Sequence, residues 1–302
     1  MTTLPQFPLQ DVLTLVRLAI AEDLGPERDD CTARLSVPAD LIGVGTLLQK
    51  AVGVACGLPL VEHVVHEFDP LIRVEMIPGF HMELIEGRFA DQRTTPLLRL
   101  RGPMRSLLAA ERTVLNLLQH LSGVATLTHK FVRRVEGTRA RICDTRKTLP
   151  GYRALDKYAV RVGGGLNHRV GLYDMVLVKD NHLAAMGGAW LGSLKQLVRQ
   201  SRNEKPERRI EVEVADIERF NKVIELDGID IILLDNMDCP AMLRCVEKRA
   251  MLGRDHIELE ASGGVTLETV RNIALTGVER ISVGALTHSA NALDISLEIE
   301  DQ

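Results

Sequence analysis

From Arg141 onward, short apolar runs alternate with stretches of helical periodicity, and this alternation limits the possible folds more than any other feature. Strands that alternate with helices are predicted to be parallel and joined by right-handed crossovers. One helical stretch, Arg153–Val162, places Leu155, Tyr158, Ala159 and Val162 on one face. The apolar runs are Ile142–Cys143, Met175–Val178, Ile210–Val214, Ile231–Leu234, Ile257–Ala261 and Ile281–Val283.

The length of this region limits the choice of parallel architecture. A complete eight-stranded barrel takes about 250 residues, so the shorter region favours an incomplete barrel or an open doubly wound sheet. No GxGxxG follows a strand, which weakens the dinucleotide-binding version of the open sheet.

The first hundred residues have a different pattern. An amphipathic helix is expected at residues 9–24 and a short helix at 60–68. Strands mixed with helices at hairpin-like spacings predict an antiparallel α+β domain. Its expected strands are 44–54, 72–77 and 96–101, and from Met104 to about Val135 the pattern is helical.

Composition excludes several classes of protein. Apolar residues make up 45% of the chain and charged residues 26%, as in globular proteins with a full core. A net charge of −4 and 3% aromatic residues disfavour a nucleic-acid-binding protein. No apolar run is long enough for a membrane span, and the first residues resemble no export signal. Five cysteines without a CxxC pair indicate reduced thiols and a cytoplasmic protein.

Polar or glycine residues follow each predicted parallel strand. In parallel α/β folds such residues build the active site at the carboxyl ends of the strands. We therefore expect a single site at one face of the barrel or sheet. The residues are Asp144, Lys179-Asp180, Glu213, Asp235-Asn236, Ser262-Gly263-Gly264 and Gly284.

Cations gather in the segment from Asp144 to His182, although the chain as a whole is slightly acidic. Arg binds carboxylates and phosphates through its two-pronged guanidinium and Lys adds a point charge, so a local anion is the expected ligand. The candidate ligands of that anion are Arg146, Lys147, His168, Arg169 and Lys179, whereas Arg153, Lys157 and Arg161 fit a solvated helix face.

Two acids, Glu213 and Asp235, close successive strands, where carboxylates coordinate Mg²⁺ or accept hydrogen bonds from sugar hydroxyls. Glu211 precedes Glu213 by two residues and points to the same side, so the pattern does not decide which acid acts. Glu258 and Glu260 present the same ambiguity, and acids inside a barrel can simply pair with cations.

Glycine turns complete the candidate site. Ser262–Gly264 precedes a helix and exposes backbone N–H groups, which predicts a phosphate-binding turn, and Val283–Ala285 is its expected second half. Arg112 lies on the apolar stripe of its helix and must reach solvent, an anion or a partner. Neither GxSxG nor HExxH occurs, so we expect catalysis by charge and position rather than by a covalent nucleophile.

Several long motifs in fixed order resemble the quinolinate phosphoribosyltransferase (decarboxylating) family, also called nicotinate-nucleotide pyrophosphorylases. They are DTRKT with PGYR, KYAVRVGGGLNHRVGLYDMVLVKDNH, EVEV, DIILLDNM, LEASGGVTLETV and ISVGALTHSA. ERTVLNLLQHLSGVAT, at Glu111–Thr126, resembles the family's dimer-interface helix. The match is dense from about Met104 to Ala290 and looser upstream.

The resemblance implies an α/β fold of the type II phosphoribosyltransferase kind. It implies an N-terminal α+β sandwich domain at residues 1–115, with the tail 290–302 packed back on it. An incomplete, seven-stranded β/α barrel would follow at 116–289. It also implies a homodimer, or a higher oligomer, with shared active sites.

The implied reaction joins quinolinate to phosphoribosyl pyrophosphate with Mg²⁺, releasing nicotinate mononucleotide, pyrophosphate and CO₂. By resemblance, Arg146, His168, Arg169 and Lys179 would hold the quinolinate carboxylates, and Arg112 would come from the neighbouring subunit. Lys147, with Thr145 beside it, would face the phosphates, and Glu213 and Asp235 would bind the ribose hydroxyls and Mg²⁺. Lys147, Lys179, Glu213 and Asp235 would be catalytic, and Ser262, Gly263, Gly264, Val283, Gly284 and Ala285 would bind the 5′-phosphate.

Two alternatives stay open. A related phosphoribosyltransferase could use another aromatic acid on the same scaffold, although five cations favour a dicarboxylate. A non-catalytic polyanion- or RNA-binding protein is disfavoured by Glu213 and Asp235, which would repel the ligand.

Overall fold

The structure, a computed structural model, describes residues 4–77, 85–92 and 94–300 of the chain. Spatial contacts divide it into two compact units, of which the first is Met1–His129, Thr148–Gly164 and Ala285–Gln302. The second is Lys130–Lys147 with Gly165–Gly284. The units are defined by spatial contacts rather than by sequence, and the boundary between His129 and Lys130 divides the long helix α5 (Met104–Val135) between them. The boundaries 1–115 and 116–289, drawn along the chain, stay a prediction.

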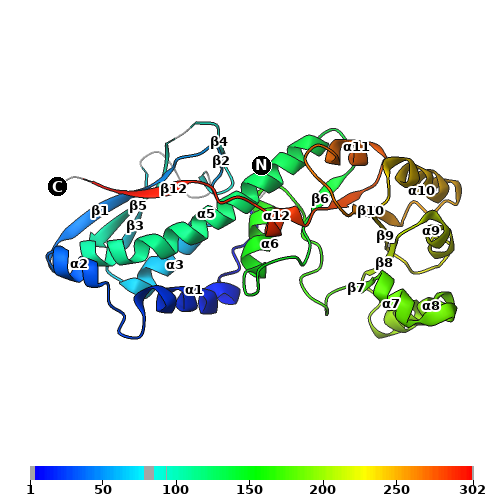
Figure 1. Ribbon diagram of the computed structural model, residues 1–302, viewed down its shortest axis with the longest axis horizontal. Coiled ribbons are helices and arrows are strands. Elements are labelled where there is room, and N and C mark those ends of the chain that lie inside the picture. The colour runs from blue at the N-terminus through cyan, green and yellow to red at the C-terminus, as the bar shows by residue number, and fades with distance from the viewer. Residues whose placement is uncertain (1–3, 78–84, 93, 301–302) are drawn as a thin grey trace. The chain divides into compact units, whose positions relative to one another are not determined.

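The first unit contains a four-stranded antiparallel sheet in the order β12-β1-β5-β3 (Figure 1). The strands are β1 (Ile42–Gln49), β3 (Arg73–Met76), β5 (Thr95–Pro103) and β12 (Ile295–Ile299). The C-terminal β12 pairs with β1, with Gly45 opposite Ile299. The tail therefore adds an edge strand to the sheet.

Helices of this unit lie close to their expected positions. The pattern at residues 9–24 matches α1 (Leu9–Leu24), and the short helix is α3 (Leu58–Phe68). The expected strand 44–54 is wrong as one element, because β1 ends at Gln49 and the chain then turns to pair β2 (Gly53–Val54) with β4 (Phe89–Ala90). The remaining helices are α2 (Cys31–Ser36), α6 (Arg153–Val162) and α12 (Ala285–His288).

The face predicted to be solvated on α6 is partly buried. Arg161 is exposed, but Lys157 is only 3% exposed, and the neighbouring Asp156 is fully buried against His120, with Oδ1 2.6 Å from Nε2. Helical spacing alone did not show that α6 is covered on two sides, so the interpretation of Lys157 as a surface residue was wrong.

The second unit is built on a six-stranded parallel sheet in the order β6-β11-β10-β9-β8-β7. Of the six strands in this sheet, the last along the chain, β11, pairs with the first, β6, as in a barrel that closes on one side. The strands are β6 (Arg141–Cys143), β7 (Val176–Val178), β8 (Ile210–Val214), β9 (Ile231–Asp235), β10 (Glu258–Ser262) and β11 (Arg280–Ser282).

The seventh strand expected from the family resemblance is reduced to one bridge. Leu166, which follows β6 along the chain, pairs in parallel with Cys143 and does not extend into a strand. Glycines at 163–165 precede Leu166 and the polar Asn167-His168-Arg169 follows it, so few side chains there favour a strand. The barrel is therefore incomplete, with six strands and a single-residue bridge among the described residues.

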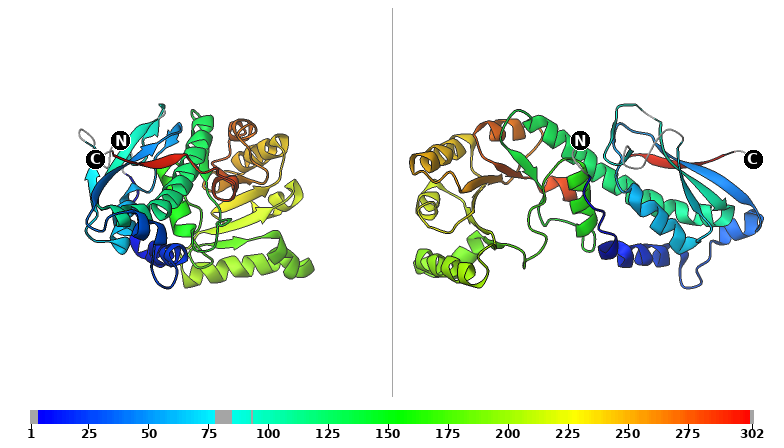
Figure 2. Two further views of the ribbon diagram at one scale, coloured as in Figure 1. Left: turned by 60° about the vertical axis from the view of Figure 1, so that its left-hand side comes forward. Right: turned by 180° about the vertical axis from the view of Figure 1, so that it is seen from behind.

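Helices cover the outer side of this sheet in the views of Figures 1 and 2. Two of them begin at aspartates whose side chains accept the first free backbone N–H groups: Asp216 from Arg219 and Asp238 from Ala241. The helices are α7 (Asp180–Ala185), α8 (Trp190–Glu204), α9 (Ile217–Val223), α10 (Cys239–Met251) and α11 (Val270–Leu275), with a 3₁₀ turn at Gly187–Ala189.

The two faces of the parallel strands differ in polarity. Side chains alternate along a strand, so Val212 and Val214 lie on one face of β8 and Glu211 and Glu213 on the other. Both acids are buried. The strands thus place an apolar face under the helices and a polar face inside the barrel.

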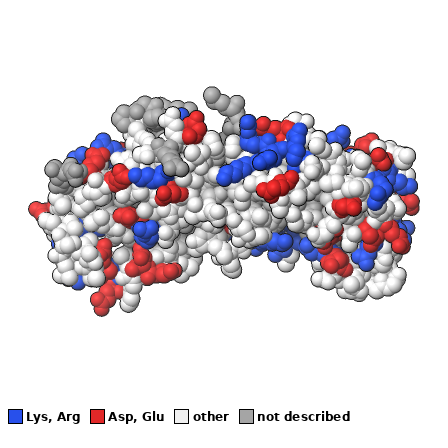
Figure 3. All heavy atoms as spheres, turned by 45° about the horizontal axis from the view of Figure 1, so that its top comes forward, with Lys and Arg blue, Asp and Glu red and all other residues white. Residues whose placement is uncertain are grey.

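On the surface drawn in Figure 3, acidic and basic side chains are interspersed, with one group of basic residues near the middle. This distribution agrees with the small net charge of −4. Within the described part of the chain, no helix combines the length and apolar character needed to span a membrane.

Candidate active site

The sheet order brings the predicted site residues of the second unit to one rim of the barrel. The carboxyl ends of parallel strands meet at the same edge. Going round the sheet, the residues following the strands are Thr145, Arg146 and Lys147 (β6), Val283 and Gly284 (β11), Ser262, Gly263 and Gly264 (β10), Asp235 (β9), Glu213 (β8) and Lys179 (β7). His168 and Arg169 follow the Leu166 bridge.

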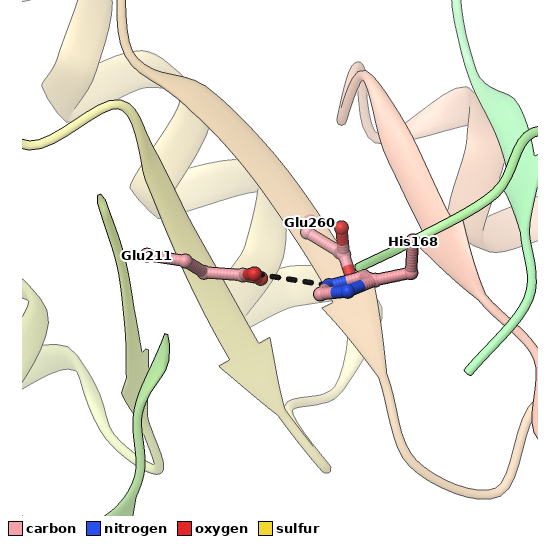
Figure 4. A group of neighbouring side chains, drawn as sticks. All are labelled: His168, Glu211 and Glu260. Atoms are coloured by element: carbon pink, nitrogen blue, oxygen red, sulfur yellow. Dashed lines mark ion pairs between the residues drawn. The ribbon is translucent and has the colours of Figure 1, made fainter. Parts of the chain in front are cut away.

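A buried group of three side chains lies inside the barrel (Figure 4). His168 Nε2 is 2.9 Å from Glu211 Oε2 and 3.4 Å from Glu260 Oε1. All three residues are buried, Glu211 and Glu260 completely. Glu260 also accepts hydrogen bonds from Arg280 Nε, at 2.6 Å, and from Ser282 Oγ, at 2.5 Å.

The charges of this group determine its protonation. Burial lowers the pKa of His168, but the two carboxylates outweigh burial and raise it to about 9. At Nδ1 the Arg169 N–H, 2.8 Å away, opposes a second ring proton, because two donors would then meet there. The raised pKa favours a second ring proton and the Arg169 N–H opposes it, and the hydrogen bond decides between them: the geometry corresponds to a ring with a proton at Nε2, facing the acids, and none at Nδ1.

The pKa values of the two acids, Glu211 and Glu260, shift in opposite directions. Burial and the charge of Glu260 raise the pKa of Glu211. Burial also acts to raise the pKa of Glu260, but His168 and Arg280 outweigh it and lower the value to about 2. Glu260 is therefore the ionised carboxylate of the pair, with His168 and Arg280 as the partners that stabilise its charge.

Two arginines at the rim lie close enough to repel each other. Burial and the charge of Arg146 both lower the pKa of the Arg169 guanidinium. Arg146 Nε is buried without a hydrogen-bond partner among the described residues, and Arg169 Nη1 donates to the Met175 carbonyl at 3.3 Å. Neighbouring cations of this kind form a binding site for an anion.

At the end of β7, Lys179 Nζ donates to Glu213 Oε2 at 2.9 Å. Glu213 lies opposite Leu233 of β9, and Asp235 follows Leu233 by two residues, so both carboxylates point to the same face. This observation separates the two acids of β8, because Glu211 faces His168 whereas Glu213 lies with Lys179 near Asp235.

The turn after β10 depends on glycine. Gly263 has φ +95°, and a Cβ there would lie 2.2 Å from Asn236 Oδ1. The Asn236 N–H donates to the Ser262 carbonyl at 2.9 Å, and its Nδ2 donates to Asp235 Oδ2 at 2.9 Å. The turn and the Asp235 carboxylate are therefore positioned together.

The other predicted residues are placed as follows. Lys147 is exposed, and its N–H donates to Thr145 Oγ1 at 3.0 Å. The Val283 N–H donates to the Cys143 carbonyl at 2.9 Å, which fixes Val283 beside the end of β6. Ala285 begins α12 of the first unit, and Arg112 lies on α5 of that unit, 60% exposed.

The sequence predicts Asp144 among the strand-end residues of the site but assigns it no role. It is fully buried, and its Oδ1 accepts the His168 backbone N–H at 2.7 Å. The sequence feature that could have indicated this role is an acid directly after a strand, followed along the chain by the glycines 163–165 that lead into His168.

Comparisons with known proteins agree on one family. The models of the N-terminal and C-terminal domains of quinolinate phosphoribosyl transferase match residues 30–122 and 124–298. A quinolinate phosphoribosyltransferase [decarboxylating] of Nicotiana tabacum is 38% identical, over 99% of this chain and 85% of its own. A nicotinate-nucleotide pyrophosphorylase [carboxylating] of Mycobacterium leprae is 41% identical, over 94% and 95%.

Solved structures give the same result. The nicotinate-nucleotide pyrophosphorylase of Francisella tularensis superposes with a TM-score of 0.86 at 34% identity, over 98% of both chains. Human nicotinic acid phosphoribosyltransferase has a TM-score of 0.60 at 13% identity, over 94% of this chain and 74% of its own, which shows a shared fold alone.

Proposed function

Because the chain belongs to the quinolinate phosphoribosyltransferase family, we propose that it transfers a phosphoribosyl group to quinolinate with decarboxylation. The products are nicotinate mononucleotide, pyrophosphate and CO₂, a step of NAD biosynthesis. The observation that carries the proposal is the pair of rim cations Arg146 and Arg169. Arg146 Nε is buried without a hydrogen-bond partner among the described residues, and an anionic substrate would bring a counter-charge to these two like charges.

In this proposal the quinolinate carboxylates bind to Arg146 and Arg169, with Lys179 at the end of β7 as the third cation. Each guanidinium can hold a carboxylate through two parallel hydrogen bonds. A dicarboxylate neutralises two cations, whereas a monocarboxylate leaves one without a counterion. The arrangement therefore favours quinolinate over nicotinate.

Phosphoribosyl pyrophosphate is proposed to bind along the other half of the rim. The 5′-phosphate lies at the turn Ser262–Gly264 and at Val283, Gly284 and Ala285, and Thr145 and Lys147 face the pyrophosphate. Glu213 and Asp235 hold the ribose hydroxyls. These two carboxylates on one face also suit Mg²⁺, which prefers oxygen ligands, and the ion would supply positive charge to the leaving pyrophosphate.

The reaction needs no protein nucleophile. The pyridine nitrogen lone pair forms the bond to ribose C1′, while the C1′–oxygen bond breaks and its electron pair leaves with pyrophosphate. Lys147 and Lys179 stabilise negative charge, and Glu213 and Asp235 stabilise the positive charge that develops on the sugar. The C2–carboxylate bond then breaks, CO₂ leaves, and the electron pair on C2 takes a proton.

The assembly and location are proposed on separate grounds. Arg112, 60% exposed on α5, is proposed to enter the site of a second copy, so that the homodimer shares its active sites. None of the five cysteines is in a disulfide, which suits a cytoplasmic protein. The net charge of −4 disfavours a nucleic-acid partner.

Turnover of the purified protein with phosphoribosyl pyrophosphate and Mg²⁺ tests the proposal, with quinolinate and nicotinate as parallel substrates. Nicotinate mononucleotide from quinolinate alone would support it. Product from nicotinate alone would refute it and favour a related enzyme that uses another aromatic acid.

A further inference from the structure

Both ring nitrogens of His168 are engaged by the protein itself. Nε2 faces Glu211 and Glu260, at 2.9 and 3.4 Å, and Nδ1 accepts the Arg169 N–H at 2.8 Å. The side chain is also buried, so it offers little surface to a ligand. A direct contact between this ring and a substrate carboxylate would require one of these interactions to break.

A metal ion is the first alternative for such a group, because the ligand atoms of His168, Glu211 and Glu260 lie within 4.8 Å of one another. The surroundings disfavour it. Arg280 Nε lies 2.6 Å from Glu260 and already supplies the positive charge that a cation would bring. Ser282 Oγ donates to the same carboxylate, so its oxygens have protein partners.

Glu211 has a less satisfied environment. Its carboxylate is completely buried, Oε2 faces His168 Nε2 at 2.9 Å, and Oε1 has no hydrogen-bond partner among the described residues. Its closest polar contact is the ion pair with His168 Nε2. Burying a carboxylate costs free energy. Since the ion pair with His168 is the one polar contact of Glu211 among the described residues, the role of Glu211 is expected to lie in that contact.

The segment carrying His168 is held at both of its ends. The buried Asp144 accepts the His168 N–H, and Asp174 accepts the N–H groups of Val170 and Gly171, at 2.7 and 2.9 Å. Between these anchors, the position of Arg169 depends on its own N–H, which donates to His168 Nδ1. The ring is therefore the link between the barrel interior and Arg169.

We propose that Glu211 and Glu260 are positioning residues that orient the His168 ring, and that the ring in turn fixes the backbone of Arg169 for binding a quinolinate carboxylate. The inference rests on the proposed function for the identity of that substrate. His168 is then itself a positioning residue, and Glu211 contacts neither phosphoribosyl pyrophosphate nor Mg²⁺.

The test compares Glu211→Met with Glu258→Met. Methionine has nearly the volume of glutamate, is uncharged, and offers Nε2 only a weak thioether acceptor. Glu258 is on the same strand as Glu260 and has shorter contacts with Arg209, at 2.8 Å, and Arg141, at 3.5 Å, than with Arg280, at 3.7 Å. None of these ion pairs involves His168, so Glu258 is the matched control for loss of a strand carboxylate. We expect Glu211→Met to raise the KM for quinolinate about tenfold or more, the size typical when a hydrogen bond to a charged group is lost. The KM for phosphoribosyl pyrophosphate should change less than about twofold, as should both constants in Glu258→Met.

A double-mutant cycle distinguishes positioning from direct binding. If Glu211 acts only through His168, adding Glu211→Met to His168→Ala leaves the KM for quinolinate within about twofold of His168→Ala alone. Fully additive effects would overturn the proposal, as would a rise in the KM for phosphoribosyl pyrophosphate. Circular dichroism checks the fold, and Glu211→Leu replaces Glu211→Met if the latter does not fold.

A second readout does not depend on turnover. In the ¹⁵N spectrum of the wild-type imidazole, we expect Nε2 protonated and Nδ1 unprotonated, and Glu211→Met should shift the Nε2 signal. An unchanged signal would overturn the proposal. Failure of the wild-type protein to use quinolinate would refute the proposed function, whereas an active wild type with an unaffected Glu211→Met variant would refute the positioning role alone.

Discussion

Replacement of Gly263 by alanine tests the turn after β10 in two separable ways. The residue has φ +95°, a conformation that costs a residue with a Cβ about 1–2 kcal/mol. The added Cβ would also lie 2.2 Å from Asn236 Oδ1, so Asn236 must move, at a further cost of about 1–3 kcal/mol. Asn236 donates to Asp235, so the displacement should also disturb the proposed ribose site.

Gly253→Ala is the matched control, because Gly253 has φ +64° and nothing within 4 Å of the added Cβ. Both variants carry the conformational cost, and only Gly263→Ala carries the clash. We expect Gly263→Ala to be less stable than Gly253→Ala by about 1–3 kcal/mol in urea unfolding. It should also raise the KM for phosphoribosyl pyrophosphate, whereas Gly253→Ala should not.

Adding Asn236→Gly to Gly263→Ala removes the clashing side chain. The double variant should regain stability but not the affinity for phosphoribosyl pyrophosphate, because the contact to Asp235 is lost. Equal stabilities of Gly263→Ala and Gly253→Ala would refute the steric reasoning. A normal KM in Gly263→Ala would refute the placement of the substrate at this turn.

Three further predictions concern charged residues. Arg146→Ala should abolish turnover while circular dichroism shows an intact fold, because a carboxylate ligand is lost; near-normal activity would refute its assignment. Mixing inactive Arg112→Ala with inactive Lys179→Ala should restore some activity if sites are shared, and no recovery despite proven subunit exchange would count against sharing. The low folded-state pKa of Glu260 stabilises the fold above its unfolded value of about 4.5, and this stabilisation is lost as pH falls toward about 2. The destabilisation by Glu260→Gln in urea unfolding should therefore be largest near neutral pH and shrink below about pH 4.5, and a constant difference would contradict the assigned charge.

Much of the site follows from sequence because parallel strands impose a simple rule. A polar residue directly after an apolar run lies at the carboxyl end of its strand, and this rule predicts Lys179, Asp235 and Ser262 on one rim from sequence alone. Helices with a continuous apolar face were predicted equally well, as the bounds of α5 and α6 show.

The depth of a side chain inside the barrel could not be predicted. Alternation puts Glu211 and Glu213 on the same face, but only the packing of the loop that carries His168 decides that Glu211 is the one covered by the ring. The same holds for Glu260, whose partners Arg280 and Ser282 come from the neighbouring strand β11. Contacts between segments that are distant in the sequence depend on how neighbouring strands are aligned, and the pattern of polar and apolar residues within one strand does not specify that alignment.

The number of barrel strands implied by the family resemblance is only partly confirmed. The resemblance implied seven strands, whereas the backbone around Leu166 makes a single bridge to Cys143. Glycines before it and a charged turn after it leave too few residues for a strand, and the same turn is the one that positions His168 and Arg169.

Release of CO₂ from the 2-carboxylate tests the central claim most directly. Purified protein is incubated with phosphoribosyl pyrophosphate, Mg²⁺ and quinolinate labelled with ¹⁴C at that carboxyl group, and labelled CO₂ is compared with nicotinate mononucleotide formed. The account predicts equal amounts of the two products and no labelled CO₂ when phosphoribosyl pyrophosphate is omitted. Nucleotide without labelled CO₂, or no nucleotide from quinolinate at all, would contradict it.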